Sequence, residues 1–172
     1  MNAYYTHREF LIRELDKLDY NKEVNILEFG TGDGSAEVLF EYAKKYPNLK
    51  IKAFDNNMDW VTSMKGKYEL INYVFEFVSD WNHMLNSYSF LDKYDLLFID
   101  QAPWEARILT LNRLGEISSV VIIHDYDYYN IGVTSQIYNV GVGSFFEKYN
   151  NKFILEGNRS KLPPTLILTN KW

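Results

Sequence analysis

Short apolar runs rich in β-branched and aromatic residues recur along the chain, and most of them end in Gly, Asn or Asp. Runs of this composition and length are typical of buried β-strands. Five are predicted in the first part of the chain, at Val24–Phe29, Lys50–Phe54, Tyr73–Val78, Tyr94–Ile99 and Ser118–Ile123. Two more, Lys152–Leu155 and Thr165–Thr169, predict sixth and seventh strands joined by a long hairpin connection.

Segments with apolar residues at helical spacing lie between these runs. The spacing predicts helices over Tyr5–Leu18, from Ser35 onward, over Met58–Lys65 and from Pro103 to Leu114. A loop is predicted at 128–143 and a short helix at 144–149. This alternation predicts an α/β fold with an open, mostly parallel sheet and helices on its faces.

The stretch VNILEFGTGDGS at residues 24–35 joins the first strand to the next helix through three glycines. Gly30, Gly32 and Gly34 allow a sharp turn and a close backbone approach to a ligand. A strand, a glycine turn and a helix form half of a nucleotide-binding unit. Ser35 occupies the place of the third glycine in the GxGxxG fingerprint, which disfavours NAD or FAD. A tight turn without a ligand is the alternative interpretation.

The turn resembles the E/DxGxGxG motif of class I S-adenosylmethionine (SAM) dependent methyltransferases, matched here by Glu28, Gly30, Gly32 and Gly34. In that family the acid lies near the methionine amino group of SAM, and the turn, which here includes Thr31, admits the ligand. The resemblance extends along the whole chain in element order. It implies a Rossmann-like sheet of seven strands, mostly parallel with an antiparallel last strand, and helices on both faces.

Acids follow successive predicted strands, and the carboxyl ends of parallel strands form the ligand crevice of such sheets. Asp55, followed by Asn56, is placed to bind the ribose hydroxyls, unless it only caps the next helix. The resemblance gives Asp80 and Trp81 to the adenine ring. A capping Asp and a core Trp are the alternative.

The segments FIDQAPWEARI and VVIIHDYD resemble small methyltransferases with FID and PxExR after strand four and a His-Asp pair after strand five. Asp100, His124 and Asp125 are therefore the candidate catalytic residues. His124 is a candidate general base, since its ordinary pKa lies near neutrality. The alternative is a histidine that orients the loop after strand five.

Two acids at adjacent strand ends also resemble catechol-type O-methyltransferases, which hold Mg²⁺ between such acids and the acceptor oxygens. Asp100 and Asp125 are oxygen ligands of the kind that Mg²⁺ prefers. However, Gln101 stands where related O-methyltransferases often have a His, and Tyr126 stands where an Asn or Asp is expected. We therefore allow Mg²⁺ without favouring it, and predict no metal ligands.

The acceptor is predicted to lie between two loops, with Trp104, Glu105 and Arg107 on one side and Tyr126 on the other. Arg107 is a candidate ligand for an anionic acceptor, or else forms an exposed ion pair with Glu105. Aromatic and charged walls favour a small-molecule or glycan acceptor.

Composition narrows the functional classes. The 172 residues fit one domain spanning 1–172, and the net charge of -5 makes nucleic acid an unlikely partner. The absence of cysteine excludes disulfides and thiolate zinc sites. No signal-peptide core or long apolar run is present, so a cytoplasmic location is expected.

The predicted function is SAM-dependent methyl transfer, preferably to oxygen. An inactive SAM-binding or nucleotide-binding module and a Rossmann-type oxidoreductase are the alternatives.

Overall fold

The computed structural model describes residues 5–125, 153–158 and 163–171. The predicted loop at 128–143, the predicted helix at 144–149 and Tyr126 lie outside the described residues.

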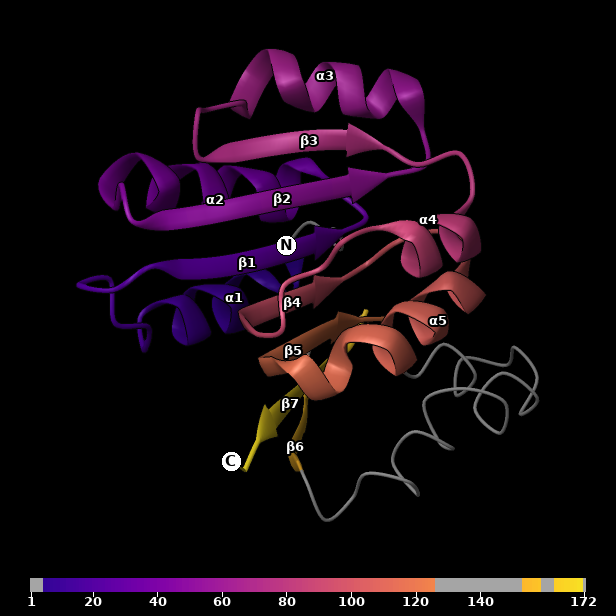
Figure 1. Ribbon diagram of the computed structural model, residues 1–172. Coiled ribbons are helices and arrows are strands. Elements are labelled where there is room, and N and C mark those ends of the chain that lie inside the picture. Colours follow the sequence, from indigo (N-terminus) through magenta and orange to yellow (C-terminus); the bar gives the residue numbers. More distant parts are fainter. Residues whose placement is uncertain (1–4, 126–152, 159–162, 172) are drawn as a thin grey trace.

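Seven strands form one sheet with the order β3-β2-β1-β4-β5-β7-β6 (Figure 1). Strands β1 to β5 are parallel to one another, and β7 is antiparallel to both β5 and β6. This confirms the predicted Rossmann-like sheet with an antiparallel last strand. The strands are β1 (Val24–Phe29), β2 (Leu49–Asp55), β3 (Tyr73–Phe77), β4 (Tyr94–Ile99), β5 (Ser118–His124), β6 (Phe153–Asn158) and β7 (Thr165–Asn170).

Helices cover both faces of the sheet, as predicted. Apolar side chains of α1 (Arg8–Leu15), α2 (Asp33–Lys45) and α3 (Met58–Tyr68) form one core with one face. Those of α4 (Trp81–Ser87) and α5 (Trp104–Leu114) form a second core with the other face (Figure 1). A single 3-10 turn, η2 (Gly115–Ile117), links α5 to β5. None of the helices in the described ranges is long and apolar enough to cross a membrane.

The structure differs from the predicted elements at a few places. Helix α4 was not predicted, because its seven residues include Asn82, Asn86 and Ser87, which are weak helix formers. Helix α2 begins at Asp33, so that Ser35 lies in its first turn instead of starting it. Strand β6 continues to Asn158, which the sequence assigned to the hairpin connection.

Strand order reverses at β1, since β2 lies on one side of it and β4 on the other. In open α/β sheets the crevice at this switch point is the usual ligand site. The glycine turn leaves β1 there, between the ends of β2 and β4.

Candidate functional site

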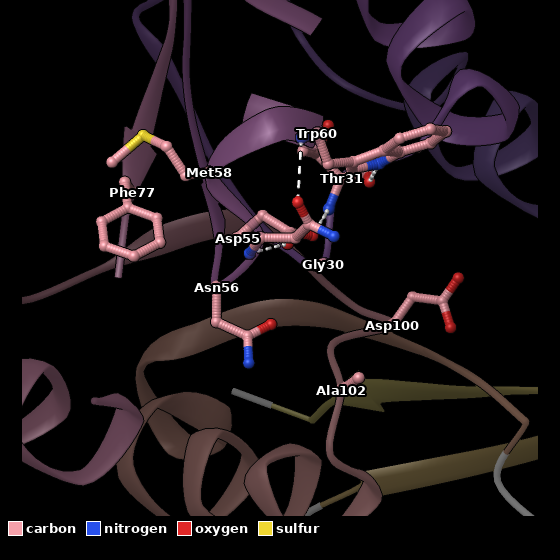
Figure 2. A pocket seen from close by; sticks show the side chains of 11 residues that line it. Gly30, Thr31, Asp55, Asn56, Met58, Trp60, Phe77, Asp100 and Ala102 are labelled. Atoms are coloured by element: carbon pink, nitrogen blue, oxygen red, sulfur yellow. Dashed lines mark hydrogen bonds between the residues drawn. The ribbon is translucent and has the colours of Figure 1, made fainter. Parts of the chain in front are cut away.

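A cavity of about 680 Å³ opens at the carboxyl ends of β1, β2 and β4 (Figure 2). The structure brings many of the predicted cofactor residues together in its lining. The lining consists of Gly30, Thr31, Gly32, Asp55, Asn56, Asn57, Met58, Trp60, Phe77, Asp100 and Ala102.

The glycine turn needs glycine at position 30. Gly30 has a φ of +83°, and a Cβ there would lie 2.3 Å from the backbone nitrogen of Gln101. Its N–H donates to the carbonyl of Phe54 at 2.8 Å, and the Asp100 N–H donates to the carbonyl of Phe29 at 2.7 Å. The turn therefore packs tightly between the ends of β2 and β4. These contacts fix the position of the backbone that lines the cavity.

Asp55 lies at the end of β2 with its carboxylate in the cavity. Oδ2 accepts from the N–H of Thr31 at 3.0 Å, and Oδ1 accepts from the N–H of Asn57 at 2.8 Å. Burial raises the pKa of Asp55, and these backbone donors partly offset the rise. Asn57, not Asp55, caps α3 by accepting from the N–H of Trp60. Asp55 thus shapes the turn and also presents an acceptor to the cavity.

Three large apolar side chains that the sequence reasoning missed lie around this carboxylate. Met58, Trp60 and Phe77 are 53%, 39% and 41% exposed. The Trp60 indole N–H donates to the carbonyl of Thr31. Met58 and Phe77 both line the cavity (Figure 2). Phe77 is the last residue of β3, and Met58 and Trp60 lie in the first turn of α3, shortly after β2. Large apolar residues near two strand ends were the available signal for this apolar rim.

Glu28 does not line the cavity. It has no exposed surface and accepts hydrogen bonds from the hydroxyls of Ser35 and, at 2.6 Å, Tyr73. Burial raises the pKa of Glu28 to about 7 even though both hydrogen bonds act to lower it. The acid of the motif therefore supports the turn from beneath, instead of facing the ligand space as the resemblance implied.

Asp80 and Trp81 lie outside the lining of the cavity. The Asp80 carboxylate caps α4 by accepting from the N–H of His83 at 2.7 Å. Trp81 is buried, and its indole N–H donates to the carbonyl of Ala102 at 2.8 Å. The geometry is that of the alternative interpretation, a helix cap and a core tryptophan.

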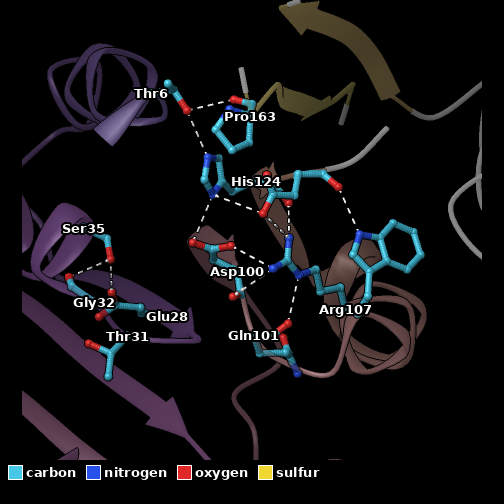
Figure 3. A network of polar contacts seen from close by, with 12 residues as sticks. Thr6, Glu28, Thr31, Gly32, Ser35, Asp100, Gln101, Arg107, His124 and Pro163 are labelled. Atoms are coloured by element: carbon cyan, nitrogen blue, oxygen red, sulfur yellow. Dashed lines mark hydrogen bonds and ion pairs between the residues drawn. The ribbon is translucent and has the colours of Figure 1, made fainter. Parts of the chain in front are cut away.

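Arg107 joins the ends of β4 and β5 from inside the protein (Figure 3). Its Nε donates to the Gln101 carbonyl at 2.8 Å, its Nη1 to the His124 carbonyl, and its Nη2 to the Asp100 carbonyl at 3.2 Å. The guanidinium also pairs with the carboxylates of Asp100 at 3.0 Å and Asp125 at 3.5 Å. With its side chain 9% exposed, Arg107 is neither an exposed partner of Glu105 nor open to an acceptor.

The position of Arg107 decides whether Asp100 and Asp125 could bind Mg²⁺, as the catechol-type resemblance allows. A guanidinium already lies between the two carboxylates that would hold the ion, so the pair does not fit Mg²⁺. The Trp104 indole N–H donates to the Asp125 carbonyl at 3.0 Å, and Asp125 has a φ of +56°. Trp104 of α5 therefore contacts Asp125, the first residue after β5, while Glu105 is exposed.

His124 is buried at the end of β5 between Thr6 and Asp100. Its Nε2 lies 3.0 Å from the Thr6 hydroxyl, and its Nδ1 lies 3.1 Å from Oδ2 of Asp100. Burial would raise the pKa of Asp100, but the neighbouring His124 and Arg107 side chains outweigh it and hold that pKa below its usual value. His124 lines neither cavity, whereas Asp100 lines both.

A second cavity of about 290 Å³ adjoins the first through Gly32, Trp60 and Asp100, which line both. It contains His7, which the sequence reasoning did not single out. His7 is 2% exposed, and burial first, then the nearby His124, lower the pKa of His7 to about 3. The complete lining is Tyr5, His7, Gly32, Asp33, Gly34, Ser35, Trp60 and Asp100.

No protein-family model matches the sequence, and no curated protein matches it. Solved structures do match. A putative O-methyltransferase from Klebsiella pneumoniae superposes with a TM-score of 0.68 at 15% identity, over 96% of this chain and 80% of that one. Human methyltransferase-like protein 13 in complex with SAH gives 0.65 at 15% identity, over 95% and 82%. An rRNA methylase from Streptococcus thermophilus gives 0.59 at 12% identity, over 99% and 97%.

The chain has the class I SAM-dependent methyltransferase fold. In this methyltransferase fold the two cavities lie at the switch point beside β1. Because the matched structures include a putative O-methyltransferase and an rRNA methylase, the fold leaves the acceptor open.

Proposed function

We propose that the protein is a SAM-dependent methyltransferase that transfers the methyl group to an oxygen of a small-molecule or sugar-like acceptor. The observation that carries the proposal is the first cavity, where a carboxylate acceptor, a close backbone turn and an apolar rim meet at the switch point of the fold. These are the three features that a nucleoside with a charged tail requires.

The adenosine part of SAM is assigned to the first cavity. The Asp55 carboxylate has the chemistry to accept hydrogen bonds from the ribose hydroxyls, with Asn56 beside it. Met58 and Phe77 offer apolar surface to the flat adenine ring. Asp80 and Trp81 are left out of this assignment because neither lines the cavity.

The methionine part is assigned to the second cavity, which adjoins the first at Gly32 and Asp100. Asp33 and Gly34 in its lining belong to the first turn of α2. The unpaired N–H groups at a helix N-terminus favour a carboxylate such as that of methionine.

Methyl transfer from a sulfonium is an in-line displacement, so the protein has to align the acceptor and exclude water. Asp100 is the one of the three predicted catalytic residues that lines the cavities, and we assign it to the acceptor. His124 lies behind Asp100 and orients it. Asp125 acts on the acceptor side only through Arg107.

Ligand-induced stabilisation tests the cofactor assignment. A ligand that binds only the folded state adds about 2.7 kcal/mol at roughly a hundredfold excess over its Kd. For a chain of this size that corresponds to about 5 to 10 °C in Tm. We expect such a shift with SAM and with S-adenosylhomocysteine. No shift with SAM together with a clear shift with NAD would assign the protein to the oxidoreductases.

Release of S-adenosylhomocysteine separates an enzyme from an inactive binding module. We expect release to depend on a hydroxyl-bearing small molecule or sugar and to be absent with oligonucleotides, because the acids at this edge repel phosphates. Tight SAM binding without release for any acceptor class would favour the binding module.

A further inference from the structure

His7, Asp100 and His124 come from three separate parts of the chain and meet beside the second cavity. His7 directly precedes α1, Asp100 follows β4, and His124 ends β5. One ligand atom from each side chain lies within 4.8 Å of those of the other two. Asp100 and His7 also line the second cavity.

Hydrogen-bond accounting fixes which nitrogen of His124 carries a proton. The Thr6 hydroxyl has one hydrogen, and it donates this to the Pro163 carbonyl at 2.8 Å. The same hydroxyl must therefore accept from His124, so Nε2 is protonated (Figure 3). In the neutral ring Nδ1 then has a lone pair, and it points at a carboxylate oxygen of Asp100 3.1 Å away. Two acceptors at this distance require a cation between them, either a proton or a metal ion.

His7 independently indicates a ligand at the same place. It is 2% exposed, and neither ring nitrogen has a hydrogen-bond partner within the part of the chain that the structure describes. An unsatisfied buried polar group costs about 1 to 3 kcal/mol. The His7 ring lies edge-on to the His124 ring with 4.6 Å between centroids, so it borders the space that His124 and Asp100 share.

We propose that His7, His124 and Asp100 bind a divalent transition-metal ion such as Zn²⁺. Two imidazoles and one carboxylate are a ligand set of this class of ion, whereas Mg²⁺ prefers oxygen. Metal bonds of about 2.0 to 2.2 Å in a tetrahedral site place ligand atoms about 3.3 Å apart. The contact of 3.1 Å between His124 and Asp100 already matches this spacing. The widest pair, at up to 4.8 Å, has to close by about 1.5 Å.

The surroundings supply the supporting contacts that metal ligands need. Thr6 holds the distal nitrogen of His124, and Arg107 holds Oδ1 of Asp100, which leaves Oδ2 for the ion. The open coordination position faces the second cavity, because His7 and Asp100 line it. An acceptor oxygen there would be polarised by the ion. This last role rests on the proposed function, whereas metal binding itself does not.

Calorimetric titration of the metal-free full chain with Zn²⁺, in the absence of SAM and acceptor, tests the site. The three histidines of the chain provide a matched pair of variants. His7→Gln removes a ligand, and His83→Gln alters the exposed histidine of α4. We expect one Zn²⁺ per chain, at least about a 100-fold loss of affinity in His7→Gln, no change in His83→Gln, and no comparable binding of Mg²⁺.

A second measurement covers the case in which His7→Gln does not fold. In the unaltered protein, Zn²⁺ should shift the NMR signals of the His7 and His124 rings and leave those of His83 in place. Absence of Zn²⁺ binding to the unaltered protein would overturn the proposal. Equal Zn²⁺ affinity in folded His7→Gln, or a shift confined to His83, would overturn it as well. Neither result would bear on SAM binding.

Discussion

Substitution of Glu28 by Gln gives the sharpest test of how the glycine turn is held. Glu28 lies in the middle of the sheet with no exposed surface, and both of its oxygens accept from hydroxyls. Burial raises the pKa of Glu28 from 4.5 to about 7, with the charges of Asp55 and Asp100 adding to the rise.

The size and sign of the effect follow from this pKa. The folded protein holds the Glu28 proton more tightly than the unfolded chain does. The free energy of unfolding therefore falls as the pH rises from 4.5 to about 7 and remains lower above it. At about 1.4 kcal/mol per pKa unit, the loss amounts to about 3 kcal/mol. Glutamine cannot ionise, so Glu28→Gln removes this loss.

Urea unfolding of both proteins between about pH 4.5 and 8.5 measures the difference. We expect the stability of Glu28→Gln relative to the unaltered protein to increase by up to about 3 kcal/mol across this range. Glutamine also places an N–H₂ group against a hydroxyl, which adds an offset that does not depend on pH. The control is Glu41→Gln, an exposed position on α2, which should leave the pH profile unchanged. Parallel profiles for Glu28→Gln and the unaltered protein would refute the reasoning.

Three further substitutions probe the site. Asp55→Ala should weaken SAM binding by about 1.5 to 3 kcal/mol in calorimetry, while Asp59→Ala, on the exposed side of α3, should not. Equal affinity in folded Asp55→Ala would leave Asp55 only its role in the turn. Gly30→Ala should cost about 3 kcal/mol or more in urea unfolding, because its Cβ would overlap the backbone of the next strand end. Arg107→Leu should cost about 3 to 5 kcal/mol by the same assay, since it leaves two partly buried carboxylates and the carbonyls of Gln101 and His124 without their cation. A loss below about 1 kcal/mol would place Arg107 among ordinary surface ion pairs.

The central strands of the sheet were predictable because they are apolar on both faces, and such runs stand out without any knowledge of their partners. Strand β1 runs VNILEF and β4 runs YDLLFI, each flanked by polar residues. The glycine turn was predictable for a similar reason, since a φ of +83° at Gly30 leaves few other residues for that position. Helix α4 was missed because seven residues carry less than two turns of periodicity.

The inward orientation of Arg107 was present in the sequence but was not used. Positions 107, 110, 111 and 114 repeat at helical spacing, and all four are buried on α5. Leu111 and Leu114 therefore already indicated that Arg107 faces the sheet. His7 offered no comparable signal. Its burial depends on the approach of the N-terminal segment to the end of β5, and that long-range contact leaves no trace in the neighbouring residues.

The acids at the carboxyl edge look equivalent in the sequence, and the structure gives each a different environment. Asp55 lines the cavity, Asp80 caps helix α4, and Asp125 is paired with a buried guanidinium. Asp100 combines two of these conditions, because one oxygen faces Arg107 and the other faces His124 beside the ligand space. The position of an acid after a strand thus predicts the edge on which it lies, whereas its chemistry depends on which N–H donors or cations contact it. For Asp100, Arg107 is the cation at Oδ1. The Zn²⁺ titration tests whether a metal ion is the cation at Oδ2, next to His124.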